Sequence, residues 1–312
     1  MTKTVVIVGG GSAGWLTAGI IAARHNPLGT VEQGIKVILL ESPDVANLGV
    51  GEGTWPTMRD TLRQIGISEV DFLKACDVSF KQGSQFINWQ RGEGESYYHP
   101  FVPPAGYGSL NLAAHWLNGD SDLNFADAVC PQGKVCDLRL APKTPQTPEY
   151  AFGLNYGYHL NAGKFVELLK SHCVDKLGVD YQIGHVDQIL SADNGDISGL
   201  SLSNGEQISG DLFVDCTGFA ALLIGKHYQV PFVSQRGCLF NDTALAVQVN
   251  HADENTPIAS CTKSTAQSSG WVWDIALPTR RGIGHVFSSQ HVSLEKAEDE
   301  LLRYLEADPA LS

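Results

Sequence analysis

The chain has 312 residues, of which 43% are hydrophobic and 18% charged, so it is long enough for one large α/β domain or two unequal ones and has a globular composition. Its net charge of −13 argues against a nucleic-acid-binding surface and against docking on anionic lipid. Seven scattered cysteines, no signal peptide and no apolar run of membrane length predict a cytoplasmic protein with reduced thiols.

The first predicted element is a buried strand that leads directly into a glycine-rich turn. Residues 5–14 read VVIVGGGSAG, with the spacing Gly9-x-Gly11-x-x-Gly14. Gly9 allows the tight turn, Gly11 lets a phosphate approach the backbone, and Gly14 lets the next helix pack on the strand. The N-terminus of that helix favours a pyrophosphate. This segment therefore predicts a dinucleotide-binding site.

Two later strands refine this prediction. The apolar strand 35–40 ends on Glu41, at a spacing close to that of the acids that accept hydrogen bonds from a ribose diol. Far along the chain, the strand 212–215 ends in Asp215-Cys216-Thr217-Gly218. A second strand that closes the site so late in the sequence favours FAD over NAD.

The middle of the chain contains helix caps and one long irregular stretch. We expect Thr54 to cap a helix that opens on Trp55-Pro56, and Ser68 to start a capping box. A strand is expected over 84–89 and a helix after Asn161. Residues 92–150, rich in Gly, Pro, Tyr and His, are typical of a functional insertion, with a short helix expected over 110–116.

Alternating and apolar runs predict the remaining strands. They are expected over 179–183, 186–192 and 197–202, and as longer strands of a second sheet over 239–250 and 270–288. The predicted fold class is α/β: an FAD-binding, Rossmann-like fold of the flavin monooxygenase type with a second β-sheet region. We expect two parts, an FAD-binding region formed by 1–92 and 151–225 and a substrate-side region formed by 93–150 and 226–312.

Four segments give the chain a resemblance to a known family. They are VVIVGGGSAGW at 5–15, GVGEGTWP at 49–56, Phe80-Lys81 followed by FINW at 86–89, and GWVWDI at 270–275. Along essentially its whole length, the chain resembles the flavin-dependent halogenases of the tryptophan halogenase family. It departs from the family's Trp-x-Trp-x-Ile-Pro signature, because Ala276 stands where the proline would be. Family members are longer, so the substrate-side region is expected to be incomplete, with a helical C-terminal part missing after Ser312.

The resemblance implies a specific chemistry. Reduced flavin would react with molecular oxygen to give a flavin hydroperoxide, and halide would attack it to form hypohalous acid. Lys81 would deliver the halogen to an electron-rich aromatic compound, either by hydrogen-bonding the acid as a cation or as a neutral amine that becomes a haloamine. Trp271, Trp273 and Ile275 would form a wall between flavin and substrate. The implied cofactors are FAD, used as FADH2, halide and oxygen.

The expected sites follow from the motifs and the resemblance together. Lys81 is the expected catalytic residue. The residues expected to contact FAD are Gly9, Gly11, Ser12, Ala13, Gly14, Glu41, Gly49, Val50, Gly51, Glu52, Val186, Thr217 and Gly218. The ten histidines lack ligand spacing, so no metal site is expected. No second glycine fingerprint for a nicotinamide is found, and we expect a separate flavin reductase to supply FADH2.

Several alternatives stay open at this point. The protein could be a flavin-dependent aromatic hydroxylase, which does not need Lys81 with Trp271 and Trp273, or a truncated, inactive FAD-binding remnant. Glu52 could lie near the flavin or only stabilise its loop. The segment 99–104, His-Pro-Phe-Val-Pro-Pro, could line an aromatic pocket or be an ordinary rigid loop.

Overall fold

The computed structural model describes residues 2–25, 34–45, 52–92, 94–119, 122–253 and 255–307. Gly49, Val50 and Gly51 of the expected FAD-contacting set lie outside these residues. The chain divides into two compact units. The first unit contains 1–48, 61–76 and 162–234, and the second contains 49–60, 77–161 and 235–312.

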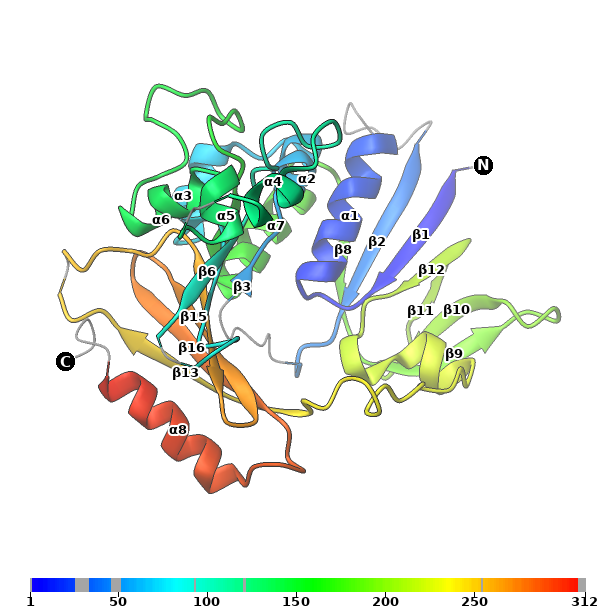
Figure 1. Ribbon diagram of the computed structural model, residues 1–312. Helices are drawn as coiled ribbons and strands as arrows, with labels where there is room; N and C mark the ends of the chain where they lie inside the picture. The colour runs from blue at the N-terminus through cyan, green and yellow to red at the C-terminus, as the bar shows by residue number, and fades with distance from the viewer. Residues whose placement is uncertain are drawn as a thin grey trace. The chain divides into compact units, whose positions relative to one another are not determined.

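The first unit is built on a four-stranded parallel sheet in the order β12-β1-β2-β8. Its strands are β1 (Lys3–Val8), β2 (Ile35–Glu41), β8 (Asp180–Ile183) and β12 (Leu212–Asp215). Helices α1 (Ser12–His25) and α7 (Ala162–Asp175) pack on each other, and α1 lies beside β1 and β2 (Figure 1). The Rossmann-like βαβ unit is thus confirmed, because β1, α1 and β2 follow one another with parallel strands.

A small antiparallel sheet completes this unit in the order β11-β10-β9. Its strands are β9 (Val186–Ser191), β10 (Ile197–Leu202) and β11 (Gln207–Ser209). Leu200 and Leu202 pack with Val6, Val8 and Leu40 in one buried cluster. Burial of each of these side chains contributes roughly 1.5–3 kcal/mol, and the cluster holds the two sheets together.

Helix starts follow the expected capping chemistry at one position and not at another. Helix α3 (Glu69–Ala75) begins after Ser68, whose Oγ accepts a hydrogen bond from the Asp71 N–H at 3.3 Å, as predicted. The predicted cap at Thr54 is wrong, because α2 (Met58–Ile65) starts four residues later. Thr54 Oγ1 accepts a hydrogen bond from the Tyr158 N–H at 2.9 Å, so this side chain fixes a strand contact and not a helix end.

The second unit is built on a six-stranded sheet in the order β13-β16-β15-β14-β5-β6. Helix α8 (Leu294–Glu306) packs on one face through Leu301, against Val272 and Ile283 (Figure 1). The stretch 92–150 contains three short helices, α4 (Leu112–Leu117), α5 (Phe125–Val129) and α6 (Gln132–Asp137). Helix α4 confirms the short helix expected over 110–116, whereas α5 and α6 were not predicted. The strands of the sheet are β5 (Gly83–Ile87), β6 (Ser96–Pro100), β13 (Thr243–Asn250), β14 (Thr262–Gln267), β15 (Gly270–Ala276) and β16 (Arg280–Phe287).

A second, three-stranded sheet in this unit has the order β3-β7-β4. It consists of β3 (Glu52–Gly53), β4 (Ser79–Lys81) and β7 (Gly157–Leu160), all antiparallel neighbours. The pairing places Lys81 opposite Gly157 and Gly53 opposite His159. Three segments far apart in sequence therefore meet at one place.

The region 270–288 differs from the single long strand that its sequence suggested. It folds into an antiparallel hairpin, with Ala276 opposite Arg281 and Pro278 in the turn. Proline cannot donate to a central ladder and fixes φ near −65°, which suits a turn better than a strand interior. The alternation within β15 sends Trp271 and Trp273 to one face of the sheet and Asp274 to the other.

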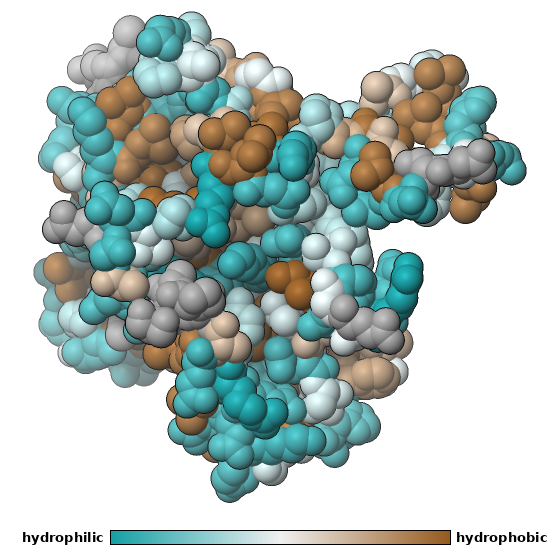
Figure 2. All heavy atoms as spheres, turned by 60° about the vertical axis from the view of Figure 1, so that its left-hand side comes forward, coloured by the Kyte–Doolittle hydropathy of each residue, from teal (hydrophilic) through white to brown (hydrophobic). Residues whose placement is uncertain are grey.

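The surface carries hydrophilic residues over most of the face shown in Figure 2, with hydrophobic residues interspersed. None of the described helices combines the length and the apolar character needed to cross a bilayer.

Candidate active site

The first unit contains a cavity of about 420 Å³ at the carboxyl ends of β1, β2 and β12. Of the residues expected to contact FAD, it is lined by Gly9, Gly11, Glu41, Val186, Thr217 and Gly218. It is also lined by Gly10, Ser42, His185 and Cys216, which the sequence reasoning did not select. Ligands of open α/β sheets bind at this end of the strands.

Close packing explains two of the glycines in the first motif. A Cβ at Gly9 would lie 2.2 Å from the Cys216 carbonyl oxygen, and one at Gly14 would lie 1.9 Å from the Gly9 carbonyl oxygen. Gly9 also has a φ of 118°, which side chains other than glycine rarely adopt. Gly14, Ser12 and Ala13 do not line the cavity. Gly14 instead allows α1 to approach the turn.

Glu41 is held in place by a neighbouring tyrosine. The Tyr181 hydroxyl donates a hydrogen bond of 2.6 Å to Glu41 Oε2, and Lys170 donates one of 3.0 Å to the same tyrosine oxygen. A Cβ at Gly10 would lie 2.3 Å from the Glu41 carboxyl carbon, so the glycine leaves room for this carboxylate. Glu41 can therefore present its second oxygen to a ribose diol in the cavity.

Asp215 organises the turn after β12 and does not line the cavity. Its Oδ1 accepts hydrogen bonds from the N–H and hydroxyl of Thr217, and its Oδ2 accepts from the N–H groups of Leu223 and Ile224. Partial burial disfavours the charged carboxylate, but these four hydrogen bonds outweigh it and lower the pKa of Asp215. The motif thus shapes the wall formed by Thr217 and Gly218.

The cavity fits the nucleotide end of FAD. Small residues give the backbone close access to a phosphate, Glu41 offers a carboxylate for a ribose, and the α1 N-terminus follows Gly11 directly. A side chain at position 10 would occupy the space of the Glu41 carboxylate.

In the second unit, Lys81 ends β4 with its amine between aromatic rings. Lys81 Nζ lies 5.6 Å from the ring centroid of Trp55 and 5.7 Å from that of Phe101. Burial lowers the pKa of Lys81 below its usual 10.5, although the neighbouring Cys261 acts in the opposite direction. A solvated surface lysine has neither this burial nor these contacts.

His159 is a buried neighbour of Lys81 that the sequence reasoning missed. A methyl group on Gly53 would lie 3.0 Å from Lys81 Nζ and 3.3 Å from His159 Cδ2. The amine and the imidazole therefore both border the space that the missing side chain of Gly53 leaves open. Burial, and secondarily the charge of Lys81, lower the pKa of His159 to about 3. His159 is therefore neutral at pH 7.

The neutral imidazole is fixed by two hydroxyl groups. Ser79 Oγ donates to the Ala276 carbonyl oxygen at 2.5 Å and is therefore left to accept from His159 Nδ1 at 3.5 Å. The hydroxyl of Thr262 then donates to His159 Nε2 at 2.8 Å. Ala276, which stands where the family signature has proline, thus anchors this network through its carbonyl oxygen.

The segment 99–104 lines an apolar cavity of about 460 Å³ in the same unit. It is also held rigidly, because the buried Gln132 accepts hydrogen bonds from the N–H groups of Phe101 and Val102 at 2.8 and 2.9 Å. The segment is therefore a rigid loop that also forms a wall of an apolar cavity, and its role in an aromatic pocket stays a prediction. Phe101 lines this cavity and also lies beside Lys81.

Trp271, Trp273 and Ile275 share the face of β15 opposite Asp274. The ring centroids of Trp271 and Trp273 are 6.3 Å apart, and Trp89 lies 6.4 Å from Trp271. Trp273 covers Gly284 on β16, where a Cβ would lie 2.1 Å from the indole. The two partly buried indoles thus pack on the sheet and on each other.

Glu52 lies in β3, opposite Leu160 of β7. It thus belongs to the strand that leads into Gly53, next to Lys81. Among the described residues, no group of three or more His, Cys, Asp or Glu side chains is arranged to hold a metal ion.

Comparison with known proteins places these features in one family. Residues 4–312 match the family model for tryptophan halogenase. The chain is 32% identical to tryptophan 6-halogenase ThaL of Streptomyces albogriseolus, with 95% of this chain and 57% of ThaL covered. It is also 32% identical to tryptophan 7-halogenase RebH of Lentzea aerocolonigenes, over 98% and 59% of the two chains.

Solved structures give the same result. A tryptophan halogenase from Shewanella frigidimarina NCIMB 400 superposes with a TM-score of 0.94 at 52% identity, covering 99% of this chain and 60% of that one. BrvH, a flavin-dependent halogenase from Brevundimonas sp. BAL3, gives 0.84 at 31% identity, over 100% and 62% of the two chains. The chain spans about 60% of the length of such relatives. It belongs to the tryptophan halogenase family, the flavin-dependent halogenases.

Proposed function

We propose that the protein is an FADH2-dependent halogenase that transfers halogen through Lys81 to an electron-rich aromatic compound of the indole or tryptophan type. The observation that carries this proposal is the amine of Lys81, half-buried and lying between the rings of Trp55 and Phe101. Bound FADH2 would supply hypohalous acid from molecular oxygen and a halide ion.

Lys81 acts as the neutral amine in this proposal. Burial lowers the pKa of the amine, which increases the fraction able to attack as a nucleophile. The lone pair of Nζ takes the halogen, the N–halogen bond replaces the O–halogen bond, and water leaves. The aromatic carbon then takes the halogen, and Nζ recovers a proton from that carbon.

The neutral state of His159 supports the same route. An imidazolium beside Lys81 would add a second positive charge and also offer an acidic proton to the amine. His159 remains uncharged, with Nε2 accepting from Thr262 and Nδ1 directed to Ser79. We assign it the role of a positioning residue that keeps the surroundings of Lys81 uncharged.

The substrate and the cofactor are assigned to separate residues. Phe101 and the apolar cavity that it lines suit a flat aromatic compound, because ring edges and faces pack favourably on one another. Trp271, Trp273 and Ile275 form the wall that keeps substrate from flavin. FAD binds through Gly9, Gly11, Glu41, Val186, Thr217 and Gly218, together with Gly49, Val50, Gly51 and Glu52, and a separate flavin reductase supplies FADH2.

The test supplies FAD, NADH, a flavin reductase, oxygen and bromide to the protein with indole and tryptophan as substrates. Mass spectrometry should show products with the bromine isotope pattern. Products that carry only an added oxygen would contradict halogenation and indicate an aromatic hydroxylase. Bound FAD without any aromatic product from a wider panel of indoles, pyrroles and phenols would indicate an inactive FAD-binding protein.

A further inference from the structure

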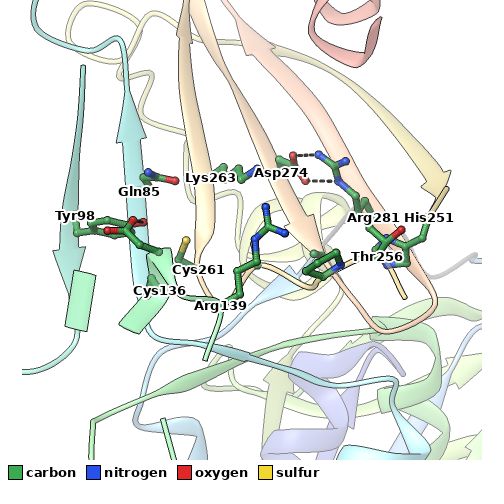
Figure 3. Close-up of a pocket in the computed structure, with 14 residues that line it drawn as sticks. Gln85, Tyr98, Cys136, Arg139, His251, Thr256, Cys261, Lys263, Asp274 and Arg281 are labelled. Carbon is green, nitrogen blue, oxygen red and sulfur yellow. Dashed lines mark hydrogen bonds and ion pairs between the residues drawn. The ribbon is translucent and has the colours of Figure 1, made fainter. Parts of the chain in front are cut away.

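The second unit contains a polar cavity of about 230 Å³ that the halogenation chemistry does not use. It lies on the face of the six-stranded sheet opposite Trp271 and Trp273, since Asp274 lines it and alternates with them along β15. Four polar residues are cross-strand neighbours in the register of four adjacent strands and form one row across the sheet. In order they are Tyr98, Gln85, Lys263 and Asp274. Figure 3 shows this row, with Arg139 pointing toward it from the end of α6.

One carboxylate of the cavity is fully paired. Arg281 Nε donates to Asp274 Oδ1 at 3.1 Å, and its Nη2 donates to Oδ2 (Figure 3). Tyr304 adds a hydrogen bond of 2.9 Å to Oδ2. Asp274 and Arg281 are 3% and 5% exposed, so water screens this pair little. Neither group is available to neutralise further charge in the cavity.

The remaining cations outnumber the remaining anion. Arg139 and Lys263 line the cavity, and the side chain of neither makes a hydrogen bond or ion pair with any residue in the described ranges. Among the described residues that line the cavity, Asp137 is the only other carboxylate, and it accepts a hydrogen bond of 2.7 Å from the neutral Tyr98 hydroxyl. Three cations therefore face two carboxylates, and the excess positive charge favours an anion.

The geometry of Arg139 is unusual for its residue type. Its φ is 55°, in the left-handed region that residues other than glycine rarely adopt. The turn is closed by a hydrogen bond of 2.9 Å from the Arg139 N–H to the Cys136 carbonyl oxygen. Such backbone conformations are energetically costly and cluster at ligand-binding sites. Here the turn brings the guanidinium to the same cavity as Lys263.

From these observations we infer that the cavity binds a small oxyanion, a carboxylate or phosphate group, between Arg139 and Lys263. The guanidinium offers a planar fork of donors that matches two oxygens of such a group, and the ammonium adds a point charge. The side-chain amide of Gln85, next to Lys263 in the strand register, supplies a further donor. The volume suits a small molecule and not a macromolecule.

The test measures binding of sodium phosphate and sodium acetate to the intact protein by isothermal titration calorimetry, against sodium chloride at equal ionic strength. We expect saturable binding of one of the two oxyanions beyond the chloride control. Phosphate binding without acetate binding identifies a phosphate ligand, and the reverse identifies a carboxylate. The absence of saturable binding for both would overturn the inference.

Variants locate the site. Arg139→Gln and Lys263→Gln should each weaken binding at least about tenfold, whereas Lys263→Arg, which keeps the charge, should retain most of it. Lys296→Gln, an exposed position on α8, is the matched control and should bind as the parent does. Unchanged affinity in both glutamine variants would overturn the assignment. Lys81→Ala should bind the oxyanion normally, which separates this inference from the halogenation chemistry.

Discussion

The buried imidazole of His159 and the amine of Lys81 adjoin the same glycine, Gly53, and only the lysine can carry a charge at neutral pH. Burial accounts for most of the low pKa of His159, and the ammonium of Lys81 lowers it further. The pair therefore combines a partly buried amine with a neighbour that stays unprotonated above about pH 3.

Removal of the Lys81 amine should abolish halogenation and spare the cofactor. Lys81→Ala is expected to lower the halogenation rate by at least about 10²-fold, because no other amine lies at the proposed transfer point among the described residues. The FAD dissociation constant should stay within about twofold of the parent value. Lys74→Ala, at an exposed position of α3, is the control. Halogenation by Lys81→Ala at the parent rate would refute the role.

The pH dependence of the rate distinguishes the two possible forms of Lys81. Because burial lowers its pKa below 10.5, the neutral fraction grows as pH rises through a value below that figure. If the neutral amine attacks, the halogenation rate should rise over the same range, measured with FADH2 supplied in excess. A rate that falls as the amine loses its proton would show that the cation, acting by hydrogen bonding, is the reactive form.

Gly53→Ala should disturb Lys81 without disturbing the nucleotide cavity. The added methyl group would lie 3.0 Å from Lys81 Nζ, which is too close, so the amine must move. A small displacement of a catalytic group costs up to about 10²-fold, and we expect a loss of at least roughly tenfold in kcat. Gly237→Ala, where an added methyl group would meet no atom within 4 Å, is the control. Equal rates for the two variants would contradict the placement of Lys81.

His159 should make the protein sensitive to acid. Its pKa is about 3 in the folded protein and close to 6.5 when unfolded, so between these values the unfolded chain binds the extra proton. The free energy of unfolding should therefore fall as pH drops from 6.5 toward 3, by a few kcal/mol at most from this residue. Urea denaturation at several pH values would measure this, and His159→Gln should show a shallower dependence. An identical slope in the variant would exclude His159 as the cause.

Glu41 should contribute to FAD affinity through its carboxylate. Glu41→Ala is expected to raise the FAD dissociation constant about tenfold or more, since a charged acceptor is lost from the cavity. Tyr181→Phe, which removes only the hydroxyl that holds Glu41 Oε2, should have a smaller effect. Fluorescence titration of FAD would rank the variants, and equal affinity of Glu41→Ala and the parent would refute the contact.

Strands β1 and β2 of the first unit were predictable because both of their faces are buried. Residues 5–8 and 37–40 are continuous apolar runs, and such runs are typical of central parallel strands. Strand β14 was not predicted, because it lacks such an apolar run. Its sequence, TKSTAQ, is almost entirely polar, and it forms a central strand through backbone pairing with β5 and β15.

Lys81 could be predicted from the sequence, but the residues around it could not. Lys81 was predicted from the family resemblance, whereas His159 and Gly53 were not associated with it. They meet because β4 and β3 both pair with β7, and hydrophobic periodicity contains no information on which distant strands pair. In the nucleotide cavity, Gly10 and Tyr181 were missed because their importance depends on contacts with Glu41.

The alternation of β15 has a consequence for how the protein can vary. Residues 271–274 read Trp-Val-Trp-Asp, so a shift of pairing by one residue would swap the indoles with the carboxylate bound to Arg281. A single insertion inside this strand would thus separate the buried guanidinium of Arg281 from its carboxylate and move two aromatic rings to the opposite face at once. Length changes that keep the register can occur in the turns on either side of the strand, at residues 268–269 and around Pro278, so natural diversity in this region should be concentrated there.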